Sequence, residues 1–190
     1  MLVVANEKDA LAQLRAGLLC CPRCAGPLAP WGYARHRQLR GPGGAAVELR
    51  PPRARCRSCK SAHVVLPGWC LPRRRDTAKL VIGALVAKVS GAGHRKIARS
   101  LGLPATTVRG WVRAATSAAS YVARVALQVA LAADARLDSL APRPTPLASA
   151  MEALGLAASA LVRALGPVAE PWDIVVAVSG GRLLGPVPAG

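Results

Sequence analysis

Two pairs of cysteines carry the clearest chemistry in this sequence. Each pair has the form C-x-x-C, at Cys21–Cys24 and Cys56–Cys59, and 31 residues separate the pairs. Such a pair makes a tight turn whose two sulfurs face one ion, so two pairs supply the four thiolates of a tetrahedral zinc site. Four thiolates leave no open coordination position, which favours a structural zinc ion over a catalytic one.

Two further cysteines and a histidine leave alternatives open. Cys20 could replace Cys21, but Cys20 and Cys24 have the wrong spacing for such a turn, and we expect Cys20 to be a small buried residue. His63 and Cys70 could each be a fourth ligand of a distorted site, and are otherwise ordinary strand and loop residues. The other interpretations are unligated cysteines or a redox dithiol, although no thioredoxin-like pattern surrounds either pair.

The residues between the pairs predict a β-hairpin, so residues 18–70 are expected to form a zinc ribbon. The sequence GPGG at residues 41–44 is a strong turn signal. Residues 46–50 have the alternating pattern of a half-exposed strand, and residues 61–67 could add a third strand. Arg53, Arg55 and Arg57 would share one face of an extended strand. We expect Arg53 and Arg55 to contact phosphate, the alternative being a solvated charged face.

A second pattern, HRKIARSLGLPATTVRGWVR at residues 94–113, predicts two helices joined by a tight turn. Gly102 suits the left-handed residue that ends a helix, and Pro104 suits the first turn of the next one. The residues expected to face inward are Ile97, Ala98, Leu101, Val108 and Trp111. With an amphipathic helix expected over residues 77–89, residues 71–115 would form a trihelical helix-turn-helix domain.

If this pair is a helix-turn-helix unit, the exposed face of its second helix enters the major groove of DNA. The expected base contacts are Thr106, Arg109 and Arg113, with Arg109 suited to a guanine edge. The expected phosphate contacts on the first helix are His94, Arg95, Lys96 and Arg99. Arg73, Arg74 and Arg75 form a basic linker suited to phosphate or to a minor groove. A purely structural helix pair is the alternative.

The charge is distributed unevenly along the 190 residues. Residues 1–113 hold 21 of the 26 basic and four of the nine acidic residues, which accounts for the whole net charge of +17. A field of this strength favours polyanions, and its confinement to the front suggests a nucleic-acid-binding module. The N-terminus lacks the pattern of a signal peptide, and we find no uncharged apolar run of about 18 residues. We therefore expect a cytoplasmic, nucleoid-associated protein with reduced thiols and no membrane partner.

The order of these motifs resembles that of a known family. The run CPRC…CRSC…RRRDT…HRKIARSLGLPATTVRGWVR is similar to the N-terminal region of insertion-sequence transposases of the DDE type, which begin with a zinc ribbon and a helix-turn-helix. It is also similar to small helix-turn-helix proteins of high-GC bacteria that have the same N-terminal arrangement of motifs. The resemblance covers about residues 18–115. It implies zinc at Cys21, Cys24, Cys56 and Cys59, and duplex DNA contact by the second helix of the pair.

In the transposases, a catalytic domain with three carboxylates and two metal ions follows. Here the acidic residues after residue 113 are Asp134, Asp138, Glu152, Glu170 and Asp173. They do not suit a two-metal site, which needs carboxylates brought together by a fold. We therefore expect no enzyme, but a duplex DNA-binding protein that acts as a transcription regulator or a transposase-derived accessory factor. One alternative is a truncated transposase that recognises element ends for a catalytic subunit in trans. Another is an RNA or single-strand binding protein, although exposed aromatic residues are scarce.

Residues 116–190 are rich in Ala and carry no net charge. Helices are expected at residues 117–140 and 149–165, joined by a Pro-rich linker at residues 141–146. Packing or self-association is the expected role, since many helix-turn-helix proteins bind two half-sites as dimers. The alternatives are a weakly ordered tail and contact with a membrane or another partner. The whole chain is thus expected to be mainly α, with a small β zinc ribbon, a helix-turn-helix domain and an Ala-rich helical tail.

Overall fold

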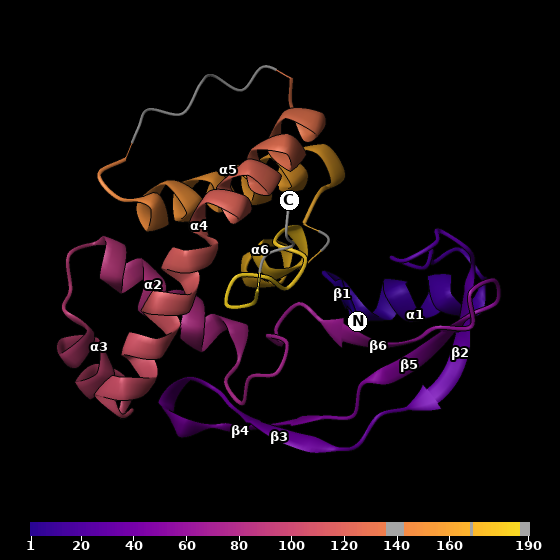
Figure 1. Cartoon of the computed structure of the whole chain (residues 1–190), viewed down its shortest axis with the longest axis horizontal. Helices are drawn as coiled ribbons and strands as arrows, with labels where there is room; N and C mark the ends of the chain where they lie inside the picture. Colours follow the sequence, from indigo (N-terminus) through magenta and orange to yellow (C-terminus); the bar gives the residue numbers. More distant parts are fainter. Residues whose placement is uncertain (136–142, 168, 187–190) are drawn as a thin grey trace.

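The computed structural model describes residues 1–135, 143–167 and 169–186 and has a mixed α and β fold, about half of it helical (Figure 1). An N-terminal β region holds the four paired cysteines, and a long helical part follows it. The fold is less helical than the mainly α protein that the sequence predicts, because residues 1–67 contribute six strands and only one longer helix.

The β region contains a four-stranded sheet and a separate hairpin. The sheet has the order β1–β6–β5–β2, and its strands are β1 (Leu2–Val4), β6 (Ala62–Pro67), β5 (Pro52–Cys56) and β2 (Leu28–Tyr33). The hairpin consists of β3 (Arg37–Arg40) and β4 (Ala46–Leu49). A short 3-10 turn over Pro42–Gly44 closes it, which confirms the turn predicted from GPGG.

Strand β1 and helix α1 (Glu7–Arg15) precede the region that the sequence analysis covered. Strand β1 is only three residues long and pairs in parallel with β6, so that Leu2 lies opposite Val65. Helix α1 begins at Asn6, whose side chain accepts a hydrogen bond from the backbone N–H of Asp9. The β region therefore begins before residue 18, and its first strand is held by a partner some 60 residues away in the sequence.

The helical part begins with three helices that share one apolar core. They are α2 (Ala78–Val89), α3 (His94–Leu101) and α4 (Ala105–Ala133). Gly102 ends α3 with a φ of 65°, the left-handed conformation that the sequence predicts. Ile97, Val108 and Trp111 are buried, as expected. The sequence pattern therefore placed the helix pair and its inward face correctly.

Helix α4 continues without a break past residue 115, where the sequence analysis placed a domain boundary. Its second half lies beside α5 (Pro146–Leu165), and the two helices run in about the same direction (Figure 1). The contact is made by buried alanines, among them Ala126 and Ala157, whose small side chains let two helices approach closely. Arg163 Nη2 lies 3.0 Å from Asp134 Oδ2 at the carboxyl ends. The predicted helical residues 136–140 and linker residues 141–142 lie outside the described residues.

The C-terminal segment returns to the main core. Helix α6 (Pro171–Val178) buries Ile174 and Val176, and Leu183 and Leu184 beyond it are buried in the same cluster as residues of α2 and α4. Gly68, directly after β6, contacts the backbone of Asp173, because a Cβ atom on Gly68 would lie 2.5 Å from the Asp173 carbonyl oxygen. The described residues of this segment are thus part of the fold and not a weakly ordered tail.

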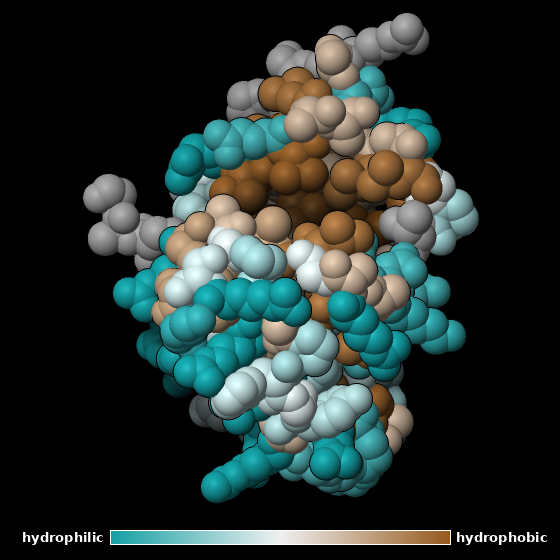
Figure 2. Space-filling view, turned by 90° about the vertical axis from the view of Figure 1, so that its right-hand side faces the viewer, coloured by the Kyte–Doolittle hydropathy of each residue, from teal (hydrophilic) through white to brown (hydrophobic). Residues whose placement is uncertain are grey.

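Apolar side chains also gather at the surface of the helical half. Figure 2 shows one face of the molecule. The upper part of this face has an apolar hollow, whereas the lower part is mostly hydrophilic. Leu131 and Leu165, at the carboxyl ends of α4 and α5, are 53% and 64% exposed. By length and composition alone α5 could span a membrane, and seven of its 20 residues are buried in the protein.

We expect Gly68→Ala to destabilise the protein by about 1–3 kcal/mol, because its methyl group would lie 2.5–2.8 Å from three backbone atoms of Asp173. The matched control is Gly155→Ala in α5, where no atom lies within 4 Å. That change should stabilise the helix by roughly 0.5–1 kcal/mol. Urea unfolding of both variants measures the difference. Wild-type stability of Gly68→Ala would contradict the packing of α6 against this strand end.

The same contact affects the ionisation of Asp173. Burial, and then the nearby charge of Glu170, raise the pKa of Asp173 from 3.8 to about 6. Because the pKa is higher in the folded state, the carboxylate costs stability above about pH 6, and this cost disappears as the pH falls toward 4. Asp173→Asn should therefore raise the melting temperature by about 2–4 °C at pH 7.5 and by less at pH 5. Asp9→Asn, an exposed carboxyl in the first turn of α1, is the control, and equal shifts at both pH values would contradict the raised pKa.

Candidate functional site

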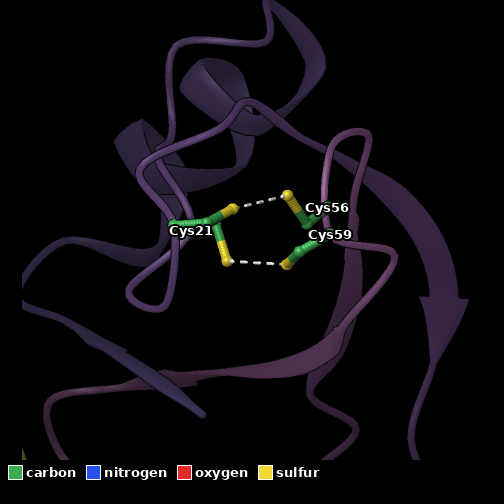
Figure 3. A group of neighbouring side chains, drawn as sticks. Cys21, Cys56 and Cys59 are labelled. Atoms are coloured by element: carbon green, nitrogen blue, oxygen red, sulfur yellow. Dashed lines mark hydrogen bonds between the residues drawn. The ribbon is translucent and has the colours of Figure 1, made fainter.

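The four cysteines that the sequence pairs as metal ligands lie together in the β region. All four sulfurs are within 4.8 Å of one another. The Sγ–Sγ distance is 3.8 Å between Cys21 and Cys59 and 3.5 Å between Cys24 and Cys56. Figure 3 shows Cys21 on one loop facing Cys56 and Cys59 on another. Tetrahedral thiolates about 2.3 Å from a zinc ion would be about 3.8 Å apart. The cluster therefore has the donors and the spacing to hold one metal ion.

The two cysteine loops have the same backbone structure. In the first loop the Cys21 N–H donates to the Gly26 carbonyl at 2.8 Å, and in the second the Cys56 N–H donates to the Ser61 carbonyl at 2.9 Å. Both bonds span five residues. The residues that follow the second cysteine of each loop have positive φ values of 57° and 61°: Ala25 and Lys60. This repeated loop, which the C-x-x-C spacing predicts, brings both pairs of sulfurs to one centre.

The loops also prepare the thiols for ionisation. The Ser61 hydroxyl and amide, together with the Cys24 thiol, lower the pKa of Cys59 to about 6. For Cys24 the Gly26 amide lowers the pKa, but the neighbouring Cys59 and Cys56 sulfurs raise it to about 11. One thiol thus ionises readily, while another keeps its proton beside the thiolate. A divalent cation supplies the positive charge that allows all four to ionise, which is how thiolate sites couple metal binding to proton release.

His63 lies beside the cluster and not among its ligands. Its Nε2 is 3.3 Å from the Cys21 sulfur, and its side chain is buried. Burial, and then the positive amino terminus, lower the pKa of His63 and favour the neutral ring. In the tautomer protonated at Nε2, the ring can donate a hydrogen bond to the Cys21 thiolate. Such a bond would orient a ligand from outside the metal sphere.

The two remaining cysteines lie outside the cluster. Cys20 is exposed, which contradicts our expectation of a small buried residue. It precedes the first loop and forms an isolated β-bridge with Pro27, so its backbone is fixed while its side chain stays at the surface. Cys70 is fully buried with Leu39, Leu49 and Leu66, and burial raises the pKa of its thiol. Cys70 therefore acts as a small apolar core residue.

The three predicted base-contacting residues lie on the first turns of α4. Thr106, Arg109 and Arg113 are all exposed, three and four residues apart, and therefore on one side of the helix. Neither arginine forms a hydrogen bond or an ion pair with any of the described residues. The predicted phosphate contacts on α3 are also accessible, since Arg95, Lys96 and Arg99 are exposed and His94 is half-buried.

The structure places the basic linker next to α4. A groove of about 790 Å³ is lined by Arg40, the three linker arginines and the first turns of α4. Its lining includes Arg73, Arg74, Arg75, Thr106 and Arg113. Arg73 and Arg75 are exposed, whereas the Arg74 guanidinium donates to the Leu184 carbonyl at 3.0 Å. Two of the three linker arginines are thus free to bind a ligand, and the third anchors the C-terminal segment.

The predicted phosphate contacts on the ribbon form a separate group. Arg53 and Arg55 are half-buried on β5 and share one face, as predicted, whereas Arg57 lies in the turn after the strand. The Arg55 Nε donates to the Lys60 carbonyl at 3.3 Å, and its guanidinium lies over the Trp31 ring. Neither Arg53 nor Arg55 lines the groove beside α4.

The role of Arg40 has no signal in the sequence. Thr77 is the N-cap of α2 but makes no side-chain capping bond. Asp76 accepts a hydrogen bond from Arg40 Nε at 2.8 Å, so the hairpin is joined to the start of the helical part. The two residues are 36 apart, and no local pattern marks the pair.

Comparison with known proteins gives one family match. Residues 21–111 match the family model of a domain of unknown function, DUF6431. The matched segment begins at the first clustered cysteine and ends at the buried Trp111 of α4, so it contains the four-cysteine cluster, the hairpin, the basic linker, α3 and the first turns of α4. No curated protein and no solved structure matches the chain.

We expect the purified protein to carry one metal ion per chain at the four-cysteine cluster. Cys56→Ser should release this ion and lower the thermal stability of the β region, because one thiolate ligand is lost. Cys20→Ser, at an exposed cysteine outside the cluster, should retain the ion. Elemental analysis and circular dichroism measure both effects. A folded wild-type protein that carries no metal and is unaffected by a chelator would contradict the site.

Proposed function

We propose that this protein is a zinc-stabilised, sequence-specific duplex DNA-binding protein without catalytic activity, acting on the nucleoid. In this proposal, α3 and α4 are the two helices of a helix-turn-helix unit. The observation that carries it is the row of Thr106, Arg109 and Arg113 on the first turns of α4, exposed and with both guanidinium groups unpaired among the described residues.

The geometry of the helix pair supports a DNA-binding role. Ile97 and Ala98 on α3 and Val108 and Trp111 on α4 are buried in one core, so the opposite face of α4 is free. The major groove of B-DNA admits an α-helix, and an arginine can bind O6 and N7 of guanine with two hydrogen bonds. Arg109 lies in the second turn of α4, where such units contact base edges.

The distribution of charge supports contact with the DNA backbone. Three basic residues of α3, the helix before α4, are exposed: Arg95, Lys96 and Arg99. Backbone contacts of this kind fix the register of the helix on the duplex, while base contacts provide specificity. Binding through several of these cations would weaken steeply as salt concentration rises.

The small core of the β region supports a structural role for the metal. Its cluster of six buried residues includes two of the cysteines themselves: Leu14, Cys21, Leu28, Ala54, Cys56 and Val65. Such a core provides little stability alone, and small domains commonly add a metal ion. Four thiolates in a tetrahedral arrangement suit zinc, with no coordination position left for a substrate.

The exposed aromatic residues favour a duplex over a single strand. Trp31 and Tyr33 are exposed on β2, where bases could stack. However, the Arg55 and Arg50 guanidinium groups lie over these rings, with Cζ 4.5 Å and 5.2 Å from the respective ring centroids. Each guanidinium covers one face of its ring and would compete there with a stacked base.

The proposal includes a homodimer formed through the C-terminal helical region. The apolar hollow in Figure 2 and the exposed Leu131 and Leu165 provide a surface for a second copy. A two-fold dimer would place two α4 helices on half-sites about one helical turn of DNA apart. Sedimentation of the purified protein measures this association directly.

We expect selection from a random duplex pool to enrich a sequence motif with the wild-type protein. In Arg109→Ala the preference at one base pair should be lost, at a cost of about 1–3 kcal/mol in affinity for the selected site. Arg124→Ala is the matched control, because this exposed arginine lies on the same helix but contacts Tyr121 and is four turns away.

The outcome of the selection separates the alternatives. A symmetric motif would report the dimer through its half-site spacing. Failure to enrich any motif, with binding that depends only on salt, would contradict base recognition and leave a non-specific polyanion-binding protein. Preferential binding of a single-stranded competitor would contradict the duplex as the ligand.

A further inference from the structure

The hairpin β3–β4 and the arginine linker form one rigid unit beside α4. The Arg40 N–H donates to the Arg75 carbonyl at 2.7 Å, and the Thr77 N–H donates to the Arg40 carbonyl at 2.9 Å. The Arg40 side chain is hydrogen-bonded to Asp76, whose side chain is only 8% exposed. These bonds attach the edge of the hairpin to the linker on both sides of residue 76.

The linker is itself a closed loop. Cys70 and Thr77 form a β-bridge at its base, so the two ends of the loop over residues 71–76 lie side by side. Arg73 has a φ of 59°, a left-handed conformation that a non-glycine residue adopts only where its surroundings hold it there. The Arg74 guanidinium donates a hydrogen bond to the Leu184 carbonyl and so attaches the loop to the C-terminal segment. Arg73 and Arg75 therefore project from a fixed backbone.

Two adjoining hollows meet at this loop. One, of about 770 Å³, lies between the loop and the hairpin and is lined by Arg37 and Arg40 among others. The other is the groove of about 790 Å³ between the loop and α4. All three linker arginines line both hollows. In Figure 1 the tip of the hairpin lies beside the amino-terminal end of α4, in keeping with the shared lining.

The lining is cationic and has an unused hydrogen-bond donor. The only acidic residue in either lining is Asp76, which is already paired with Arg40. The Nε of Arg37 is buried and has no hydrogen-bond partner among the described residues. A buried donor without a partner is costly.

We propose that this surface, which we name the hairpin groove (Arg37, Arg40, Arg73 and Arg75), binds one phosphodiester strand of the duplex contacted by α4. This inference rests on the proposed function and deepens it. The strand would pass from the hairpin across the loop to the side of α4, and its phosphates would fix the register of the helix on the bases. The ribbon arginines Arg53 and Arg55 lie outside this groove and have no part in it.

The test compares two double variants that remove the same charge. Arg73→Ala with Arg75→Ala removes two groove arginines, and Arg53→Ala with Arg57→Ala removes two ribbon arginines. Affinity for the selected duplex and for a random duplex is measured by fluorescence anisotropy across a range of salt concentrations. Circular dichroism and metal content establish that both variants are folded.

We expect the groove variant to lose roughly tenfold in affinity for both duplexes at about 0.1 M salt. The slope of log affinity against log salt should become shallower by the equivalent of about two phosphate contacts. Its ratio of selected to random affinity should stay unchanged, since phosphate contacts carry no sequence information. The ribbon variant should change the slope by less than half as much. Arg37→Ala should lower the slope further, by about one phosphate.

Equal losses in the two double variants would overturn the proposal, because the effect would then be one of net charge alone. An unchanged slope in the groove variant would overturn it as well. These outcomes are distinct from failure of the proposed function, which is a wild-type protein that selects no sequence. If that protein still binds random duplex, and the salt dependence of its affinity still depends on Arg73 and Arg75, then phosphate binding by the hairpin groove is supported and only base recognition fails.

Discussion

The attachment of Arg40 to residues 75–77 is the interaction on which the arrangement of the two halves depends. A two-stranded hairpin alone is barely stable in water, and here β3 is extended by backbone bonds to the linker and by the Arg40–Asp76 pair. A small apolar cluster of Leu39, Leu49, Leu66 and Cys70 joins the hairpin to β6. These contacts attach the hairpin to the linker and to β6, and so determine where it lies relative to α4.

The cysteine cluster and the helical part are therefore connected through the sheet. Cys56 ends β5, the strand between β2 and β6, and β6 leads directly through Gly68 to the linker. Loss of an ion from the four thiolates would disturb the β5–β6 pairing first, because the second cysteine loop joins these strands. The contact between the His63 ring and the Cys21 sulfur links β6 to the first loop as well. A structural metal would thus affect the groove beside α4 without touching it.

What could be predicted from the sequence is what local spacing determines. The C-x-x-C pairs predicted the cysteine cluster, and GPGG predicted the hairpin turn. Gly102 and Trp111 indicated where the helix pair turns and which face of it is buried. Contacts between distant segments had no such signal. The parallel β1–β6 pairing, the Arg40–Asp76 bond and the return of α6 to Gly68 each depend on the tertiary fold. Cys20 was misplaced because its spacing to the other cysteines does not show whether its side chain is buried, and the structure leaves it exposed. The DNA contacts stay predictions.

The contact between Gly68 and Asp173 has a consequence for synthesis of the chain on the ribosome. The cysteine cluster and the four-stranded sheet involve only residues up to 67, so they can assemble while helices α2–α6 are still being translated. The apolar surfaces of α2 and β1 that α6 covers remain open until residues 171–186 have emerged. A nascent chain that stalls before that point would expose these surfaces to chaperones and proteases, although its four clustered cysteines have already emerged.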